Sequence, residues 1–493
     1  MTPSPHPATP TLSDLSPEAR GLLETQTIEL PSWAFGNSGT RFRVFTTAGV
    51  PRNPYEKIDD VAEVNRLTGV TPRISLHIPW DRTDDYDALR RHAEDQGISI
   101  GTINSNVFQD EDYKLGSLCN PDERIRAKAI AHHLECIDIM RATGSPALKI
   151  WLADGTNYPG QDSIRERQDR LADSLGRVYA ALDSDQQLVL EYKFFEPAFY
   201  HTDVPDWGTS LVHCQALGER AKVVLDTGHH APGTNIEFIV AQLIRLGRLG
   251  AFDFNSRFYA DDDLIVGAAD PYQLFRIMNE IVAAGALAPD SGVNFMLDQC
   301  HNLEEKIPGE IRSATNVQEA TAKALLVDRE ALSAARAVGD VLAANDAVAA
   351  VTTPADEAGT YDSGATTIAL SGDSATVSGS GATVDGSTVT ITSSGTYVVS
   401  GSLSDGQIVV NADDADVRLV LDGATITNAD GPAVNVVDAG SVVVVLAAGS
   451  ANSLSDGASY ADTSDNAPTA TLYSSDDLTI TGTGSLSVTG LAR

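Results

Sequence analysis

The chain has 493 residues, 42% of them hydrophobic, and its 68 acidic residues outnumber 34 basic ones to give a formal net charge of −34. This length predicts more than one domain, and the hydrophobic share is sufficient for a packed core. The acidic balance argues against nucleic acids and anionic membrane surfaces as partners, because both are bound through basic side chains.

The N-terminal extension, residues 1–30, lacks the apolar region of a secretory signal, so we expect a cytoplasmic protein. Residues 31–346 then alternate between short β-rich apolar runs and amphipathic runs. The amphipathic runs at 58–69 and 87–97 end at glycine, as helices often do. The strand candidates are FRVFTT (42–47), RISLHI (73–78), SIGTINS (99–105), ALKIWLA (147–153), LVLEYK (188–193), KVVLDTGH (222–229), GAFDFNS (250–256) and VNFMLDQ (293–299).

Eight strand–helix units in alternation predict an α/β fold in which the sheet closes into a (β/α)8 TIM barrel. Several of the strands are nearly continuous apolar runs, which is typical of parallel strands buried on both faces. No G-x-G-x-x-G sequence follows the first strand, so the usual dinucleotide site is excluded.

The composition changes near residue 350. Residues 347–365 have the character of a linker, and residues 366–493 repeat short runs of alternating Val, Ile, Leu and Thr between Gly, Asp, Asn and Ser turns. This pattern predicts an all-β domain of the β-solenoid type. Residues 351–493 contain 17 acidic residues but only two basic ones, and we expect most of these aspartates to form turns.

Functional side chains of a (β/α)8 barrel lie at the carboxyl ends of its strands and in the loops that follow. The polar residues at these positions could each have a purely structural role. The aspartates at 261–263 could be a solvated run of charge, and Asp226 could form a loop hydrogen bond with His229. Glu191 could form a salt bridge with Lys193. Together, however, so many like charges would repel one another unless a cation neutralised them. Carboxylates with one imidazole suit Mg²⁺, Mn²⁺ or Co²⁺, and their number indicates two ions. The candidate ligands are Glu191, Asp226, His229, Asp253, Asp261, Asp263 and Asp298.

The segments EYKFFEP (191–197), LDTGHH (225–230), FDFNSRFYADDDL (252–264) and LDQCHN (297–302) together resemble the broad-specificity bacterial L-rhamnose isomerases, members of the xylose isomerase-like superfamily. The resemblance extends over about residues 25–345. It implies isomerisation of L-rhamnose to L-rhamnulose on the open-chain sugar, by a metal-assisted hydride shift or an enediol route. It also implies two divalent ions per barrel, with Mn²⁺ favoured and Mg²⁺ or Co²⁺ as alternatives.

The same resemblance implies a role for each candidate residue. One ion would be held by Glu191, Asp226, Asp253 and Asp298, and the second by His229, Asp261 and Asp263 with Asp226 bridging. Lys193, His77 and Asp263 would be catalytic, and His77, Trp151 and Lys193 would contact the sugar. In two respects the chain departs from the family: Asp253 stands where the family has histidine, and the helical extension that builds the family's homotetramer is replaced. The sequence therefore leaves the oligomeric state open.

Residues 380–493 resemble secreted bacterial proteins with a carbohydrate-binding domain. Since the segment shows no aromatic platform for stacking on sugars, a scaffold without a ligand is the alternative for this domain. For the whole chain, two alternatives to the isomerase remain. One is a sugar epimerase on the same barrel, and the other is a catalytically impaired fusion that acts as a carbohydrate-binding or surface protein.

Overall fold

The computed structural model describes residues 15–40, 43–196, 200–259, 261–300, 302–352, 364–462, 464 and 467–491. Parts of the expected extension 1–30 and linker 347–365 therefore lie outside the described residues. The chain divides into two compact units, one formed by Leu12–Arg329 and one that contains Glu330–Arg493. Among the helices that are described, none combines the length and the apolar character that a membrane span requires.

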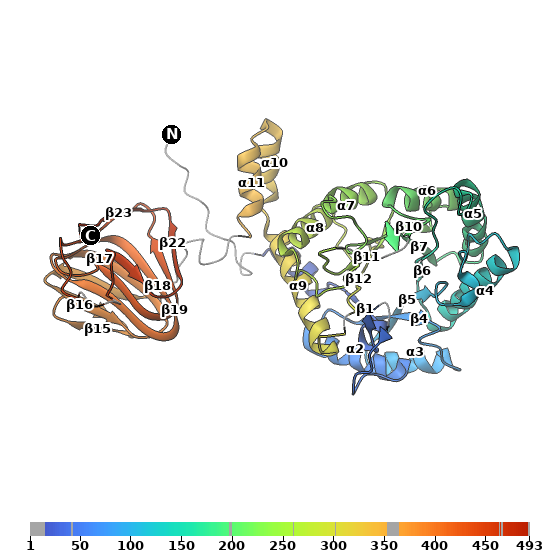
Figure 1. Cartoon of the computed structure of the whole chain (residues 1–493), viewed down its shortest axis with the longest axis horizontal. Helices are drawn as coiled ribbons and strands as arrows, with labels where there is room; N and C mark the ends of the chain where they lie inside the picture. Colours follow the sequence, from blue (N-terminus) through green and yellow to red (C-terminus); the bar gives the residue numbers. More distant parts are fainter. Residues whose placement is uncertain are drawn as a thin grey trace. The chain divides into compact units, whose positions relative to one another are not determined.

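Eight parallel strands close into a barrel in the first unit, which confirms the predicted (β/α)8 architecture. The helices form a ring around these strands (Figure 1). In their order around the barrel, the strands are β1 (Glu29–Pro31), β12 (Asn294–Leu297), β11 (Leu249–Phe254), β10 (Ala221–Asp226), β7 (Gln187–Glu191), β6 (Ala147–Ile150), β5 (Ser99–Ser105) and β4 (Arg73–Ile78). The helices are α2 (Pro54–Thr68), α3 (Tyr86–Asp95), α4 (Glu123–Thr143), α5 (Ile164–Ala180), α6 (Trp207–Leu217), α7 (Ile236–Arg245), α8 (Pro271–Ala283) and α9 (Lys306–Leu326).

Local sequence explains where these elements begin and end. The α2 helix begins after Asn53, whose side chain accepts a hydrogen bond from the Glu56 amide, and ends at Gly69, whose φ of 73° favours glycine. Aspartates cap α3, α4, α6 and α8 in the same way. The β4 and β5 strands coincide with the predicted runs, and every residue after the first of each is buried. These capping residues fix where the helices begin, and the parallel strands place the loops that precede the helices at one mouth of the barrel.

The predicted first strand, FRVFTT at 42–47, is wrong. Of its described residues, 43–47, Arg43–Val44 form the strand β3, which is exposed and, within the part of the chain that the structure describes, pairs with β2 (Gly39–Thr40) and not with the barrel. The first barrel strand is instead the short β1, in which the buried Glu29 accepts hydrogen bonds from the Thr102 amide at 2.8 Å and Asn294 Nδ2 at 3.1 Å. A three-residue strand that contains a buried acid carries no apolar pattern, whereas 42–47 has the β-branched and aromatic composition of a strand.

Further helices and short strands lie in the barrel unit or directly after it in the sequence. They are α1 (Pro17–Glu24), the 3-10 helices Ser32–Phe35 and Glu111–Tyr113, the hairpin of β8 (Phe195–Glu196) and β9 (Tyr200–His201), α10 (Arg329–Val338) and α11 (Val341–Ala349). The β8–β9 hairpin belongs to the loop that follows β7.

Residues from 366 onward form the predicted all-β domain. Most of its strands pair in parallel with strands from the next turn of the chain, so that Tyr397, Leu419, Val444 and Ile480 stack in register. Parallel stacking of this kind is the architecture of a β-solenoid. The strands are β13 (Thr366–Gly372), β14 (Ser374–Ser378), β15 (Ala382–Asp385), β16 (Thr388–Ile391), β17 (Gly395–Leu403), β18 (Gln407–Asn428), β19 (Val434–Leu446), β20 (Ala451–Asp456), β21 (Leu472–Ser474), β22 (Leu478–Gly482) and β23 (Ser485–Thr489).

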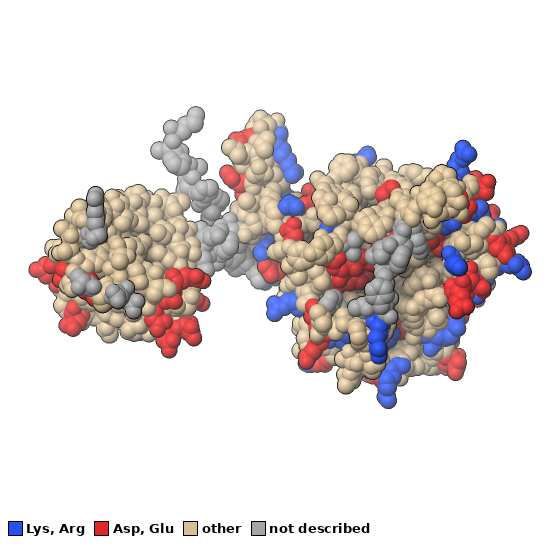
Figure 2. Space-filling model, in the orientation of Figure 1, with Lys and Arg blue, Asp and Glu red and all other residues tan. Residues whose placement is uncertain are grey.

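The interior of this domain is an aliphatic core in which Ile368, Val399, Leu421 and Val436 are inaccessible to solvent. The alternation of buried and exposed residues along the strands turns the polar side chains outward. Figure 2 shows acidic side chains and no basic ones on the coloured surface of this domain that faces the viewer. The negative charge counted in the sequence thus lies partly on this surface.

Candidate metal centre

Four neighbouring strands bring carboxylates to the mouth of the barrel. Glu191 ends β7, Asp226 ends β10, Asp253 lies in β11, and Asp298 follows β12 directly. Each of the four offers an oxygen within 4.8 Å of the oxygens of the other three, and we refer to them as the deep cluster. Since Asp226 and Asp253 are inaccessible to solvent, this cluster lies below the surface of the mouth.

A second group of donors, which we call the outer cluster, consists of His229, Asp261 and Asp263. His229 Nδ1 lies 3.1 Å from Glu191 Oε1, and its Nε2 lies 2.9 Å from Asp261 Oδ1. His229 also offers a ligand atom within 4.8 Å of those of Glu191 and Asp226, so the two clusters adjoin. Asp261 and Asp263 adopt left-handed backbone conformations, with φ of 54° and 48°, which aspartate and asparagine tolerate better than most residues.

The electrostatics of these groups favour a positive partner. Burial raises the pKa of Asp226, Asp263 and Asp298, and the neighbouring carboxylates raise it further. Burial alone would lower the pKa of His229, but Asp226 and Asp261 raise it well above the ordinary value. A site whose carboxyl groups resist ionisation is suited to a divalent cation, which would stabilise their charged form.

The donor set fits such an ion. Asp263 Oδ1 is buried and has no hydrogen-bond partner among the described residues. Carboxylate oxygens with one imidazole are the ligands that hard or borderline divalent ions accept. The deep cluster could therefore hold a metal, and so could His229 together with Glu191 and Asp226. Among the described residues, no group of three donors within 4.8 Å of one another includes Asp261 or Asp263, which line the cavity beside these groups.

A cavity of about 160 Å³ opens beside the clusters. Its aromatic wall includes Trp151, against which Phe108 packs edge-on with ring centroids 4.8 Å apart. Also in the lining, His77 in β4 stacks on Trp80 at 3.9 Å. The lining comprises Trp33, His77, Trp80, Asn104, Ser105, Phe108, Lys149, Trp151, Glu191, Lys193, His229, Asp261, Asp263 and Asp298.

Lys193 is fixed at the edge of this cavity. Its Nζ lies 2.5 Å from Asp261 Oδ2 and 3.2 Å from Glu196 Oε2, and 5.0 Å from the centre of the Trp151 ring. Lys193 thus forms ion pairs with Asp261 and Glu196. The salt bridge with Glu191, which was the structural alternative for that residue, is not among these pairs. Burial opposes its charge, but Asp261 and Glu196 raise the pKa of Lys193 above the ordinary value, so the ammonium stays protonated.

Two further polar atoms of the cavity are left without partners among the described residues, His77 Nδ1 and Trp151 Nε1. Burial lowers the pKa of His77 to about 3, with the nearby positive charge of Lys57 acting in the same direction, so the ring is neutral at pH 7. Buried polar atoms normally have hydrogen-bond partners. Those of His77 and Trp151 are therefore available to a polar ligand such as a polyhydroxylated molecule.

The structure brings together all the site residues predicted from the sequence, and adds three that the sequence analysis missed. Lys149 in β6 contacts Asp253, Trp33 Nε1 donates to Asp298 Oδ1 at 2.9 Å, and Asn255 Nδ2 donates to Asp226 Oδ1 at 3.0 Å. Trp33 was missed because the first strand was misplaced. Lys149 carried a usable signal, since a lysine inside the apolar run ALKIWLA must be buried or paired.

A buried polar network ties together three loops on this side of the barrel. Arg167 in α5 donates from Nη2 to Asp203 Oδ2 at 2.7 Å and to Cys119 Sγ at 2.9 Å, and the Asp154 carboxylate accepts from the Ser117 amide at 2.6 Å. Cys119, Asp154 and Asp203 lie close enough to share a cation, but the Arg167 guanidinium already supplies the positive charge there. The network consequently holds the loop after β7, which also carries Lys193.

Replacing Arg167 with methionine is expected to lower the free energy of unfolding of the barrel by about 3–5 kcal/mol, because Asp203 would stay buried without its partner. Intrinsic fluorescence during urea denaturation measures this, since the four tryptophans, at 33, 80, 151 and 207, all lie in the barrel unit. Arg124→Met, which removes an exposed pair with Asp122, is the control and should leave the midpoint unchanged. Equal midpoints for the two variants would contradict the structural role of Arg167.

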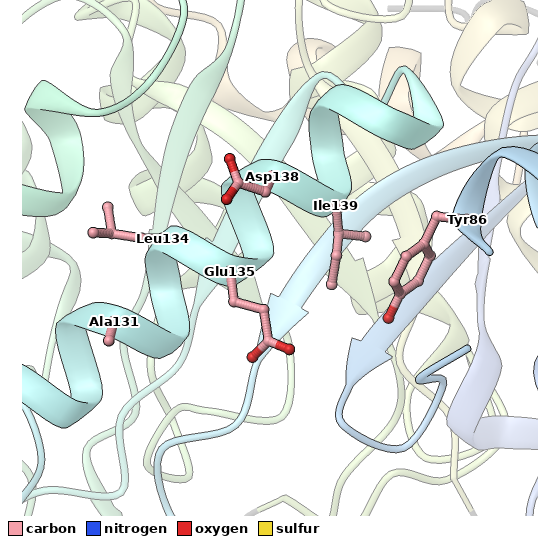
Figure 3. A pocket seen from close by; sticks show the side chains of 6 residues that line it. All are labelled: Tyr86, Ala131, Leu134, Glu135, Asp138 and Ile139. Carbon is pink, nitrogen blue, oxygen red and sulfur yellow. The ribbon is translucent and has the colours of Figure 1, made fainter. Parts of the chain in front are cut away.

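A larger hollow, of about 510 Å³, lies elsewhere, on the helical layer of the barrel (Figure 3). Its walls come from Tyr86 in α3 and from one side of α4, where Glu135 pairs with Arg82 and His132. None of the groups of metal-type donors among the described residues includes a residue of this hollow. The strand ends, and not this surface, therefore form the candidate site.

Comparison with known proteins gives results for both units. Residues 61–301 match the family model of the xylose isomerase-like TIM barrel, and residues 385–493 match a family described as carbohydrate-binding domain-containing proteins. A probable sugar isomerase from Rhizobium meliloti (strain 1021) is 45% identical over 325 residues, which are 65% of this chain and 76% of that protein. A second probable sugar isomerase, from Mesorhizobium japonicum, is 44% identical over 339 residues, which are 67% of this chain and 78% of that protein.

The C-terminal unit has relatives of its own. A carbohydrate-binding domain-containing protein from Acetivibrio thermocellus is 42% identical over 97 residues, which are 19% of this chain. The match spans only 34% of the length of that protein. The two units of this chain therefore resemble two different groups of proteins.

Proposed function

Because the chain belongs to the sugar isomerases with a xylose isomerase-like TIM barrel, we propose that it interconverts an aldose and a ketose, with L-rhamnose and L-rhamnulose as the first pair to test. The observation that carries this proposal is the adjacency of the deep and outer clusters beside a cavity with unpartnered polar atoms. The choice of L-rhamnose rests on the ordered motifs at 191–197, 225–230, 252–264 and 297–302.

Two divalent ions would be held by this site. Glu191, Asp226, Asp253 and Asp298 of the deep cluster would bind one, and His229, Asp261 and Asp263 would bind the other together with Asp226. A bound divalent ion supplies a Lewis acid that polarises sugar oxygens. The excess of carboxylates favours Mn²⁺, with Mg²⁺ and Co²⁺ as alternatives.

The side chains around the cavity would orient the open-chain sugar. The neutral His77 ring and the Trp151 N–H offer hydrogen bonds to hydroxyl groups, and the faces of Trp33, Trp80 and Phe108 suit the C–H side of a sugar. These contacts would position the substrate between the aromatic wall and the carboxylates, so that its first two carbons would face the clusters.

Charge and proton movement would fall to Lys193 and Asp263. The Lys193 ammonium, held by Asp261 and Glu196, would stabilise negative charge as it develops on a sugar oxygen. In an enediol route, Asp263 Oδ1, which has no partner among the described residues, would accept the proton that leaves one carbon and return it to the neighbouring carbon. In a hydride-shift route, hydrogen would pass directly between the two carbons, which these residues would orient. In both routes a hydroxyl proton also moves between the two neighbouring oxygens, and the product is the same.

We expect the purified chain to convert L-rhamnose into a ketose in the presence of Mn²⁺, with a turnover of about 1 to 1,000 per second, the usual range for enzymes. Ketose formation is followed by a colorimetric assay, and the product is identified by NMR. D-Xylose as substrate tests the breadth of the site, and EDTA-treated protein is the blank. Formation of a C3 epimer from a ketose substrate instead of an aldose–ketose exchange would replace the isomerase with an epimerase.

A further inference from the structure

A lysine reaches into the deep cluster. Lys149 lies in β6, and its side chain is 3% exposed. Its Nζ lies 2.8 Å from Oδ1 and 2.6 Å from Oδ2 of Asp253, and 3.6 Å from Met296 Sδ. Both carboxylate oxygens of Asp253 are therefore already in contact with a cationic group of the chain itself.

Lys149 and Asp253 form a buried ion pair, in which the two side chains are 3% and 0% exposed. Asp253 is the carboxylate of the deep cluster that a lysine pairs with, whereas Glu191 Oε1 lies 3.1 Å from His229 Nδ1. Asp226 accepts hydrogen bonds from the Gly228 amide and from Asn255, and Asp298 accepts one from Trp33. These donors are neutral, so among the described residues neither Asp226 nor Asp298 has an ion pair as close as that of Asp253.

We propose that Lys149 is a built-in counter-charge that neutralises Asp253, leaves Glu191, Asp226 and Asp298 to hold the divalent ion of the deep cluster, and lowers the affinity of that cluster for the ion. The inference rests on the proposed metal-dependent function and refines it. When a bound ion keeps all four carboxylates ionised, the deep cluster and Lys149 together carry a net charge of −3, whereas the four carboxylates alone carry −4. A less negative cluster binds a cation less tightly and releases it more readily.

A direct test is the titration of metal-free protein with Mn²⁺ in the absence of sugar, with free Mn²⁺ measured by electron paramagnetic resonance. Lys149→Met removes the positive charge and frees Asp253, so at least one binding step should become tighter by about tenfold or more. Lys149→Arg keeps the charge and should bind Mn²⁺ within about threefold of the unmodified chain. The double variant Lys149→Met with Asp253→Asn restores the net charge of −3, and its affinity should also lie within about threefold.

The outcomes separate the possibilities. An unchanged or weaker affinity of Lys149→Met would overturn the inference, and so would a loss of binding in the double variant, which would make Asp253 a ligand. Should Lys149→Met not fold, the double variant decides the question, because its buried pair is neutral. Tighter binding in Lys149→Met together with no isomerase activity in any form would leave the inference standing and refute the proposed function.

Discussion

Asp263→Asn is expected to lower turnover of the sugar by at least about 1,000-fold while the barrel remains folded. The substitution removes the negative charge of the one carboxylate in the outer cluster whose Oδ1 has no partner among the described residues. It keeps the size of the side chain, and asparagine tolerates the φ of 48° at this position. Both a weaker ion site and the loss of the candidate proton acceptor lower kcat, which steady-state assays with L-rhamnose measure.

The neighbouring aspartate provides a matched control. Asp262 lies in the same loop, and its Oδ2 accepts hydrogen bonds from the amides of Phe258 and Tyr259. Asp262→Asn retains an acceptor oxygen and removes the same charge from the loop without altering the lining of the cavity. We expect its turnover to stay within about threefold of the unmodified chain. Comparable losses in the two variants would mean that the charge of the loop, not Asp263, is responsible.

Chelation of bound metal is expected to abolish turnover and to lower the melting temperature of the barrel, more strongly at pH 8 than at about pH 5.5. Burial raises the pKa of Asp226, Asp263 and Asp298 in the folded chain, whereas in the unfolded chain such groups ionise near pH 3.8. The stability that these groups contribute is therefore complete below pH 3.8 and is lost as the pH rises through the folded-state pKa values. A divalent ion counteracts this loss, because it stabilises the ionised carboxylates.

Tryptophan fluorescence during heating, with Mn²⁺ or with EDTA, measures the difference in melting temperature at each pH. We expect the Mn²⁺-dependent increase to be several degrees at pH 8 and to shrink toward about pH 5.5, as protons compete with the ion for the carboxylates. Removing EDTA and adding Mn²⁺ should restore both stability and turnover, which excludes irreversible damage. An increase of equal size at both pH values would contradict the raised pKa values of the buried carboxyl groups.

The sequence predicted a strand correctly where the local pattern of apolar residues matches the burial of the strand. The β4 and β5 strands were predicted to the residue, because parallel strands covered on both sides are apolar throughout. The β1 strand was missed because its three residues include the buried Glu29, whose partners, Thr102 and Asn294, are distant in the chain. Pairings between distant residues leave no trace in a local window.

The candidate site shows the same limit. Its carboxylates could be proposed because each follows a predicted strand or lies within one, and strand ends of a barrel converge at one mouth. The contacts among them could not be derived from the sequence. The pairing of Lys193 with Asp261, 68 residues away, depends on the left-handed turn of the loop after β11, and that of Lys149 with Asp253 depends on the register around the barrel.

Glu191 and Asp226 contribute ligand atoms to two groups of donors, the deep cluster and the trio that they form with His229. Because these groups share two carboxylates, two cations held by the proposed site would not bind independently of each other. The first would reduce the negative potential felt by the second, but it would also fix the shared carboxylates in an ionised, oriented state. Whichever effect is larger, thermodynamic linkage requires it to be mutual, so each ion changes the binding affinity of the other by the same factor.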